Sequence, residues 1–332
     1  MIVGIGLTEP HAGSDAGVPH LRAVRDGDVW VLNGVKSLSF ARDAAAVVVF
    51  ARTSKEEVRG KGISAFLVPL NLPGVTREAY CDMGSRAIGR GAANFTEVRI
   101  PANHLLGEEG SGFSQVMQGF DFSRALIGLQ CIGVARVTLD ETWAYVSQRE
   151  AFDLPLSKYQ GVSFPLAEAE TLLSAARLLC YQTLWLGDQR LPHTAQAAMC
   201  KWWVPKTAFE IVHNCLLLHG QYGYCTDLPL EQRLRDVVGV QIADGTAQIM
   251  KLITRAASSD VLLLREQVST NTTHQRCPAD YADCSGMRYR WLSLRRARAV
   301  VNRSRESAVA TASQLPDRNF AANGNQTSAT GD

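Results

Sequence analysis

A chain of 332 residues is long enough for two domains, because a domain typically spans roughly 100–200 residues. Apolar residues make up 46% of the chain and charged residues 20%, which are the proportions of an ordinary globular protein. The net charge of +2 excludes a strongly basic or acidic protein, so the overall charge does not indicate a nucleic acid or a membrane surface as partner.

The first part of the chain predicts short strands separated by turns. Val29–Leu32 precedes Asn33 and Gly34, a pair that favours the tight turn of a β-hairpin. Further short runs rich in β-branched and aromatic residues occupy 45–51, 62–70 and 94–100. Strands this short and this closely spaced predict a small antiparallel β-barrel or sandwich.

From Gly112 onward, apolar residues recur at spacings of three and four. This period predicts amphipathic helices, and we expect four of them, at 113–150, 161–187, 194–220 and 229–256. Helices of this length can form an antiparallel four-helix bundle with a substantial core.

After about Ala257 the composition changes. Residues 258–332 include an Arg-rich stretch and end in a tract of Asn, Gly, Ser and Thr, which predicts disorder. An Arg-rich tail can also grip nucleic acid, but no aromatic platform or binding motif accompanies this one, so we expect no nucleic-acid partner.

Cysteine usage and the lack of targeting signals favour a soluble intracellular protein, cytoplasmic in a bacterium or mitochondrial in a eukaryote. Cys131, Cys180, Cys200 and Cys215 lie in apolar stretches, which is typical of buried thiols in a reducing compartment. No apolar run approaches the ~20 residues that cross a bilayer, and the N-terminus lacks a secretory signal, so we expect no membrane insertion.

Four blocks of sequence resemble, in order and spacing, those of the acyl-CoA dehydrogenases over roughly residues 3–256. They read LTEPHAGSD at Leu7–Asp15, DMG to LLGEEGSGF between Asp82 and Phe113, FDFSR at Phe120–Arg124, and PLEQRLRD to IADGTAQI between Pro229 and Ile249. The resemblance implies a multi-domain α+β fold: a middle β-domain at 1–107, a C-terminal four-helix bundle at 108–257, and a tail at 258–332 without counterpart in the family. Complete members also have an N-terminal helical domain, which this chain is expected to lack.

The resemblance also implies a reaction. Family members use FAD to oxidise acyl-CoA thioesters: a carboxylate removes the α-proton while the β-hydrogen leaves as hydride to flavin N5. The signature I-x-E-G-T that carries the base reads IADGT here, which assigns the base to Asp244. Other members carry the base at the position of Phe122, which cannot serve. The aspartate pattern is similar to the branch acting on alicyclic substrates such as cyclohexanecarboxyl-CoA.

The same motifs imply the binding residues. Those implied for FAD are Leu7, Thr8, Ser39, Phe40, Arg149, Phe152, Gln160, Leu217, Gln221, Thr246 and Gln248. Those implied for acyl-CoA are Ser14, Asp121, Arg124, Ala243 and Gly245. In relatives, an arginine and a phenylalanine matching Arg149 and Phe152 cross a subunit interface to the ADP half of the flavin. No metal site is expected.

Simpler interpretations of the same residues stay open. Thr8 and Ser14 can belong to a polar loop, Arg124 and Asp121 to a solvated ion pair, and Asp244 to the turn that Asp-Gly pairs favour. The sequence also departs from the family, with KSLSF at Lys36–Phe40 in place of K-x-W-I-T and LLHGQ in place of Q-x-H-G-G.

The expected partners are an acyl-CoA substrate, an electron-transfer flavoprotein as electron acceptor, and further copies of the chain in a dimer or tetramer. An acyl-CoA oxidase that passes electrons to oxygen is an alternative. So is a catalytically inactive fragment that pairs with a full-length relative.

Overall fold

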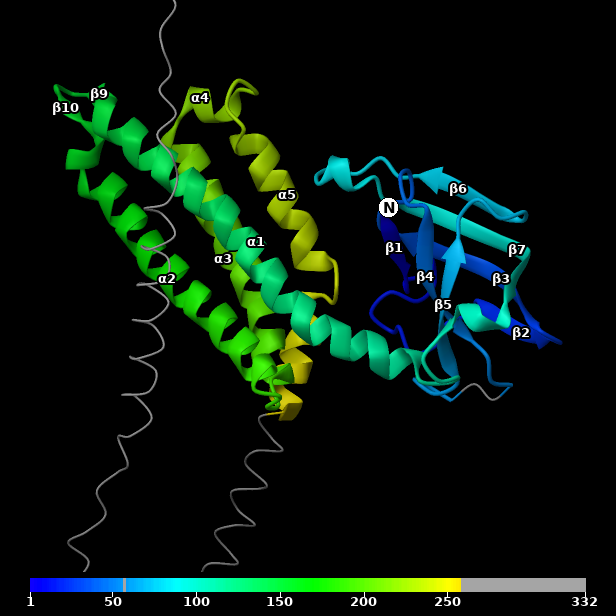
Figure 1. The fold of residues 1–332 in the computed structure, drawn as a ribbon. Coiled ribbons are helices and arrows are strands. Elements are labelled where there is room, and N and C mark those ends of the chain that lie inside the picture. The colour runs from blue at the N-terminus through cyan, green and yellow to red at the C-terminus, as the bar shows by residue number, and fades with distance from the viewer. Residues whose placement is uncertain (56–57, 258–332) are drawn as a thin grey trace, which may run out of the picture. The chain divides into compact units, whose positions relative to one another are not determined.

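The computed structural model describes residues 1–55 and 58–257; the predictions for 258–332 lie outside this part. The first hundred residues form a curled eight-stranded sheet (Figure 1). Its strands are β1 (Val3–Gly6), β2 (Arg22–Asp26), β3 (Val29–Leu38), β4 (Ala46–Arg52), β5 (Ile63–Pro69), β6 (Val75–Ala79), β7 (Gly91–Pro101) and β8 (Leu105–Leu106). They follow the order β6-β7-β3-β2-β4-β5-β8, with β1 beside β4. Most pairs are antiparallel as expected, but β1 and β2 both run parallel to β4, so the sheet is mixed.

The hairpin turn expected at Asn33 and Gly34 is wrong. Both residues lie inside β3, which continues past a bulge in its pairing with β7. Gly34 has a φ of 142°, and a Cβ there would lie 2.7 Å from the Cα of Leu21, so this position requires glycine for a close backbone approach. The actual turn between β2 and β3 contains Gly27, with a φ of 60°.

The core of the sheet domain is filled by alternate positions of β3 and β7 and by most positions of β4 and β5. Leu32, Val47, Phe66 and Ile100 are fully buried, and the Trp30 ring meets the edge of Phe66 with ring centroids 5.2 Å apart.

The helices begin at Gly112. They are α1 (Gly112–Gln148), α2 (Gln160–Asp188), α3 (Thr194–Leu218), the short α4 (Gln221–Tyr224) and α5 (Leu230–Ile242), and a further helical segment covers 247–257. The first three match the predicted helices, whereas the single helix expected at 229–256 is wrong. It is broken at 243–246, where Asp244 and Gly245 adopt φ values of 54° and 103°, because a left-handed backbone ends a helix.

Small residues let the helices pack closely. A Cβ on Gly128 of α1 would lie 2.7 Å from Sγ of Cys180 on α2, so glycine allows the approach. Cys131, Cys180, Cys200 and Cys215 are buried free thiols, as predicted.

Helix α1 is long and apolar enough to cross a membrane by length and composition alone, which differs from the expectation that no run approaches that length. A core helix of a soluble protein meets the same criterion. Helix α1 packs against both α2 and α3 within the bundle core.

A loop of the sheet domain contacts α5. The Ser85 amide donates to Oδ1 of Asp236 at 2.5 Å, and Arg235 donates to the Met83 carbonyl oxygen at 2.5 Å. Between them Gly84 approaches so closely that a Cβ would lie 2.5 Å from the Arg235 carbonyl oxygen. These contacts fix the sheet against the helix whose C-terminal turn carries Asp244.

Candidate active site

A cavity of about 400 Å³ lies between strands β1, β4 and β5 and the N-terminal part of α1. Most of its wall is apolar, including Ile5, Phe50 and Phe120, and its polar side chains are those of Gln115, Ser123 and Asp244. A mostly apolar cavity of this size with a few convergent polar groups is typical of a small-molecule site.

Asp244 is the acidic residue of this wall. It follows α5 in the turn 243–246, with a left-handed φ of 54° that is uncommon for a residue other than glycine. Burial raises the pKa of its carboxyl group, while Lys201, Arg124 and the Ser123 hydroxyl act in the opposite direction. The net shift is upward, which moves the carboxylate toward the basicity that a general base needs. The turn interpretation and the base interpretation of Asp244 are therefore compatible.

The turn is held from two sides. Nε of Arg124 donates to the Asp244 carbonyl oxygen at 3.4 Å. Nζ of Lys201 donates to the carbonyl oxygens of Val240 at 2.6 Å and Gly245 at 3.2 Å. Sequence analysis did not single out Lys201 or the cavity residues Gln115 and Ser123. The available signal for Lys201 was a charged residue at a position of the predicted helix that otherwise faces the core.

Arg124 and Asp121 form a buried ion pair rather than a solvated one. Their side chains are 3.1 Å apart, and the Arg124 side chain is only 5% exposed. Asp121 also accepts a hydrogen bond from the Thr194 hydroxyl at 2.5 Å, which ties α1 to the start of α3. Phe122, on the same helix, is 58% exposed and does not line the cavity.

Several residues implied for FAD lie at the sheet edge beside the cavity. The Ile5 amide donates to Oγ of Ser39 at 3.2 Å, and the Ser37 amide donates to the Thr8 carbonyl oxygen at 2.8 Å. These bonds place Leu7, Thr8, Ser39 and Phe40 next to Ile5 of the cavity wall. The Thr8 side chain is exposed, and its hydroxyl has no hydrogen-bond partner within the described part of the chain.

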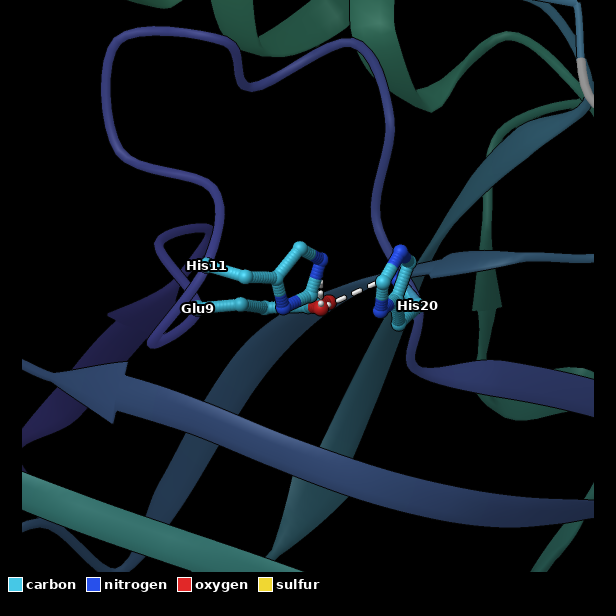
Figure 2. A group of neighbouring side chains, drawn as sticks. All are labelled: Glu9, His11 and His20. Atoms are coloured by element: carbon cyan, nitrogen blue, oxygen red, sulfur yellow. Dashed lines mark hydrogen bonds and ion pairs between the residues drawn. The ribbon is translucent and has the colours of Figure 1, made fainter.

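The loop that carries Thr8 and Ser14 is closed by Glu9. Figure 2 shows this carboxylate with His11 and His20 beside it. Its oxygens accept hydrogen bonds from Nζ of Lys36 at 2.6 Å and from the amides of His20 and Leu21 at 2.8 and 3.1 Å. Although burial favours the protonated acid, Lys36 and the amides lower the pKa of Glu9.

The Glu9 carboxylate is thus already neutralised by a buried ammonium group. The two imidazole rings are stacked, with centroids 3.4 Å apart, and one potential ligand atom from each of Glu9, His11 and His20 lies within 4.8 Å of the others. The hydrogen bonds of Glu9 hold the two ends of this loop together. Ser14, in the middle of the loop, is exposed at the surface.

The remaining residues implied for FAD fall into two other places. Arg149, Phe152 and Gln160 lie around the hairpin of β9 (Glu150–Ala151) and β10 (Leu154–Pro155), where the Phe152 side chain is 91% exposed. Leu217 and Gln221 lie at the same end of the bundle, because Tyr145 near the end of α1 stacks on His219 at the end of α3.

Helix α5 separates that end of the bundle from Asp244. The 13 residues of α5 span about 20 Å. The implied FAD residues at that end of the bundle and those beside the cavity therefore do not surround a common point within one chain. The last two implied residues, Thr246 and Gln248, lie directly after the Asp244 turn, and the implied substrate residues Ala243 and Gly245 flank Asp244 within it.

Two family models match this sequence and fold. The acyl-CoA dehydrogenase middle domain matches residues 4–98, and the acyl-CoA dehydrogenase C-terminal domain matches residues 110–258. The chain belongs to the acyl-CoA dehydrogenase family. The predicted family and fold class are therefore confirmed.

Individual members agree with this assignment. The rat mitochondrial short-chain specific acyl-CoA dehydrogenase is 40% identical over 74% of this chain. The butyryl-CoA dehydrogenase of Megasphaera elsdenii is 32% identical with a TM-score of 0.75, covering 77% of this chain and 67% of that one. A structure described as the electron transferring flavoprotein of Acidaminococcus fermentans is 34% identical with a TM-score of 0.75, covering 77% and 68%. The chain spans 60% of the length of the rat relative.

Proposed function

We propose that this acyl-CoA dehydrogenase family chain catalyses FAD-dependent α,β-dehydrogenation of an acyl-CoA thioester, with Asp244 as the base. The observation that carries the proposal is the position of Asp244 as the acidic side chain of an apolar cavity. A thioester α-proton is weakly acidic, so its removal needs a carboxylate shielded from water.

The residues around Asp244 have complementary tasks. The apolar wall formed by Ile5, Phe50 and Phe120 excludes water from the acyl group, and this desolvation also raises the pKa of the Asp244 carboxyl group. Arg124 and Lys201 oppose that rise, because their positive charges favour the ionised carboxylate. The Ser123 hydroxyl limits the orientations of the carboxylate.

The chemistry of the residues at the sheet edge fits a flavin. Exposed Thr8 offers a hydroxyl without a partner in the described chain, beside apolar Leu7 and Ile5, and this combination suits a flat heteroaromatic ring with polar edges. Bound FAD would supply the acceptor for the β-hydride. Arg149 is exposed and has no ion-pair partner among the described residues, so its guanidinium is available for a diphosphate.

We further propose a small or alicyclic acyl group as substrate. Aspartate is one methylene shorter than glutamate, so the α-carbon must approach the turn 243–246 more closely than in relatives with glutamate. A ring places its α-carbon differently from a straight chain, which suits the shorter base. The names of the short-chain and butyryl-CoA relatives are consistent with a small acyl group.

Electrons are proposed to pass to an electron-transfer flavoprotein, in keeping with the similarity to the Acidaminococcus structure. The separation between the sheet-edge residues and the Arg149 group supports a homo-oligomer in which two chains complete each FAD site.

The proposal is tested by purifying the full chain, supplying FAD and adding acyl-CoAs anaerobically. We expect bound flavin whose visible absorbance is lost on adding cyclohexanecarboxyl-CoA or butyryl-CoA, with the former faster, and little change with a long-chain acyl-CoA. Bound flavin that no acyl-CoA reduces would overturn the proposal. Rapid reoxidation by air with production of hydrogen peroxide would instead favour the oxidase.

A further inference from the structure

Lys201 is a fully buried lysine in the middle of α3. Its side chain is 0% exposed, whereas lysine is normally a surface residue because burying its charge is costly. A residue that brings such a cost into the bundle core must make specific interactions there.

The ammonium group of Lys201 bonds two carbonyl oxygens on either side of Asp244. One belongs to Val240, 2.6 Å away, in the last turn of α5, and the other to Gly245, 3.2 Å away, in the turn itself. The last carbonyls of a helix have no partner within it, and a positive charge there also complements the helix dipole. Lys201 therefore caps the C-terminal end of α5 and, through the same ammonium group, ties the following turn to it.

The conformation that this bond pattern holds is a strained one. Asp244 has a φ of 54°, and for a residue with a side chain such a conformation persists only where the surroundings determine it, whereas Gly245 adopts its positive φ without strain. Two residues of α1 also contact Asp244: Nε of Arg124 lies 3.4 Å from its carbonyl oxygen, and the Ser123 hydroxyl bonds its side chain. Lys201 differs from both because it bonds the turn at Gly245, 3.2 Å away, and also the end of α5 at Val240, 2.6 Å away.

We propose that Lys201 is a positioning residue that locks the turn 243–246 and so holds the Asp244 carboxylate in the cavity. The catalytic consequence rests on the proposed function of Asp244, but the structural role does not. Lys201 acts through the turn, because the residues that line the cavity do not include it.

The charge of Lys201 acts on the same group. Lys201 opposes the upward shift in the pKa of Asp244 that burial causes. A neutral residue at position 201 therefore both loosens the turn and raises the pKa of the carboxyl group. These two effects separate a positioning role from simple packing.

The structural test compares Lys201→Met with Lys206→Met by hydrogen–deuterium exchange. Lys206 lies on the same helix, but it is exposed and pairs with Glu210 at 2.8 Å, so its variant is a matched control. In Lys201→Met we expect at least about tenfold faster exchange in the peptide covering 241–250, which contains the Ala243 amide bonded to the Gly239 carbonyl oxygen at 3.1 Å. Exchange elsewhere in α1 to α3, and everywhere in the control, stays at the wild-type rate.

The kinetic test uses FAD-loaded full chain. Lys201→Met is expected to lower kcat at least about tenfold with less than about a threefold change in KM, and to move the acid limb of the pH profile to higher pH. If the wild type shows no dehydrogenation but the turn loosens, the proposed function fails and the positioning role stands. Unchanged exchange at 241–250 in a folded Lys201→Met variant would overturn the positioning role.

Lys201→Gln keeps the experiment decisive if the methionine variant does not fold. The glutamine side chain is one atom shorter than that of lysine and carries no charge, although its amide group can still donate to the carbonyl oxygen of Val240 or Gly245. The same faster exchange at 241–250 is expected, and wild-type exchange there would overturn the proposal.

Discussion

Asp244 combines a strained backbone conformation with a carboxyl group that is partly removed from water. Its φ of 54° turns the chain back after α5, and this turn directs the side chain into an apolar cavity instead of into solvent. Strain of this kind, of order 1–3 kcal/mol, is concentrated at functional sites, where the surrounding structure offsets it. In the proposed mechanism, this left-handed turn is what would bring the short carboxylate to the substrate.

The length of the side chain is tested with Asp244→Glu. If a ring requires the shorter base, the variant should lose at least about tenfold in turnover of cyclohexanecarboxyl-CoA and less for butyryl-CoA, because the longer side chain collides with the ring carbon. Steady-state kinetics on both substrates provide the measurement. Faster turnover of cyclohexanecarboxyl-CoA with unchanged straight-chain activity would reject the alicyclic assignment.

At the residue scale, a sequence motif singled out Asp244, which lines the cavity, but not all of the residues that contact it. The IADGT signature marks the aspartate itself. Ser123 lies in the FDFSR block without an assigned role there, and Lys201 was not singled out; their proximity to Asp244 arises only when α1, α3 and α5 pack together. Arg124 was identified, but its burial also depends on tertiary packing.

At the scale of elements, the sequence predicted helices α1 to α3 well, because long apolar periodicity determines them. Two errors arose where one or two residues decide the backbone. The Asn-Gly pair at 33–34 forms a bulge instead of a turn, since neighbouring Leu21 and the pairing with β7 outweigh its local preference. The helix expected at 229–256 breaks at 243–246, because a charged lysine from another helix stabilises the interruption.

The buried contact between α3 and this interruption predicts a pH-dependent stability. Burial lowers the pKa of Lys201 from 10.5 to about 8, against the opposing influence of Asp244 and Cys131 and together with that of Arg124. Between these pH values the unfolded chain binds more protons than the folded chain, so stability rises with pH. Below pH 8, Lys201 is protonated in both the folded and the unfolded chain. The folded chain then bears the full cost of burying the charged ammonium group, about 3 kcal/mol of unfolding free energy.

Chemical denaturation of wild type and Lys201→Met between pH 7 and pH 10 measures this effect. The wild type should gain about 3 kcal/mol of unfolding free energy relative to the variant over that range. Arg124 stays charged throughout, and Cys131 stays a neutral thiol because burial raises its pKa to about 12. A constant difference between the two proteins across the range would show that Lys201 titrates normally.

At the scale of the whole molecule, the residues implied for FAD do not form one continuous site within a single chain. One group lies at the sheet edge beside the cavity, and another, with Arg149 and Phe152, lies beyond the far end of α5. The outer face of α2 also exposes large apolar side chains, at Leu178, Tyr181 and Trp185. Exposed apolar surface of this kind is typical of an interface, which agrees with an FAD site shared between copies of the chain.

Arg149→Ala tests this arrangement. Because Arg149 is exposed and unpaired within the described residues, the apo variant should keep the wild-type melting temperature. Its FAD affinity should fall at least about tenfold, since a charge-assisted bidentate bond to phosphate is worth more than 1.4 kcal/mol. Flavin titration and melting curves with and without FAD give both quantities. Arg177→Ala, an exposed arginine of α2, is the control, and equal FAD affinity in the two variants would argue against a role for Arg149.

The proposed reaction depends most on Asp244 as the group that accepts the α-proton. The direct measurement is the rate at which acyl-CoA removes the visible absorbance of bound flavin in one anaerobic turnover, in wild type, Asp244→Asn and the exposed-loop control Asp227→Asn. If Asp244 is the base, the rate falls at least about 100-fold in Asp244→Asn, with bound FAD and acyl-CoA retained, and stays at the wild-type value in the control. Flavin reduction at the wild-type rate in Asp244→Asn would contradict this role of Asp244.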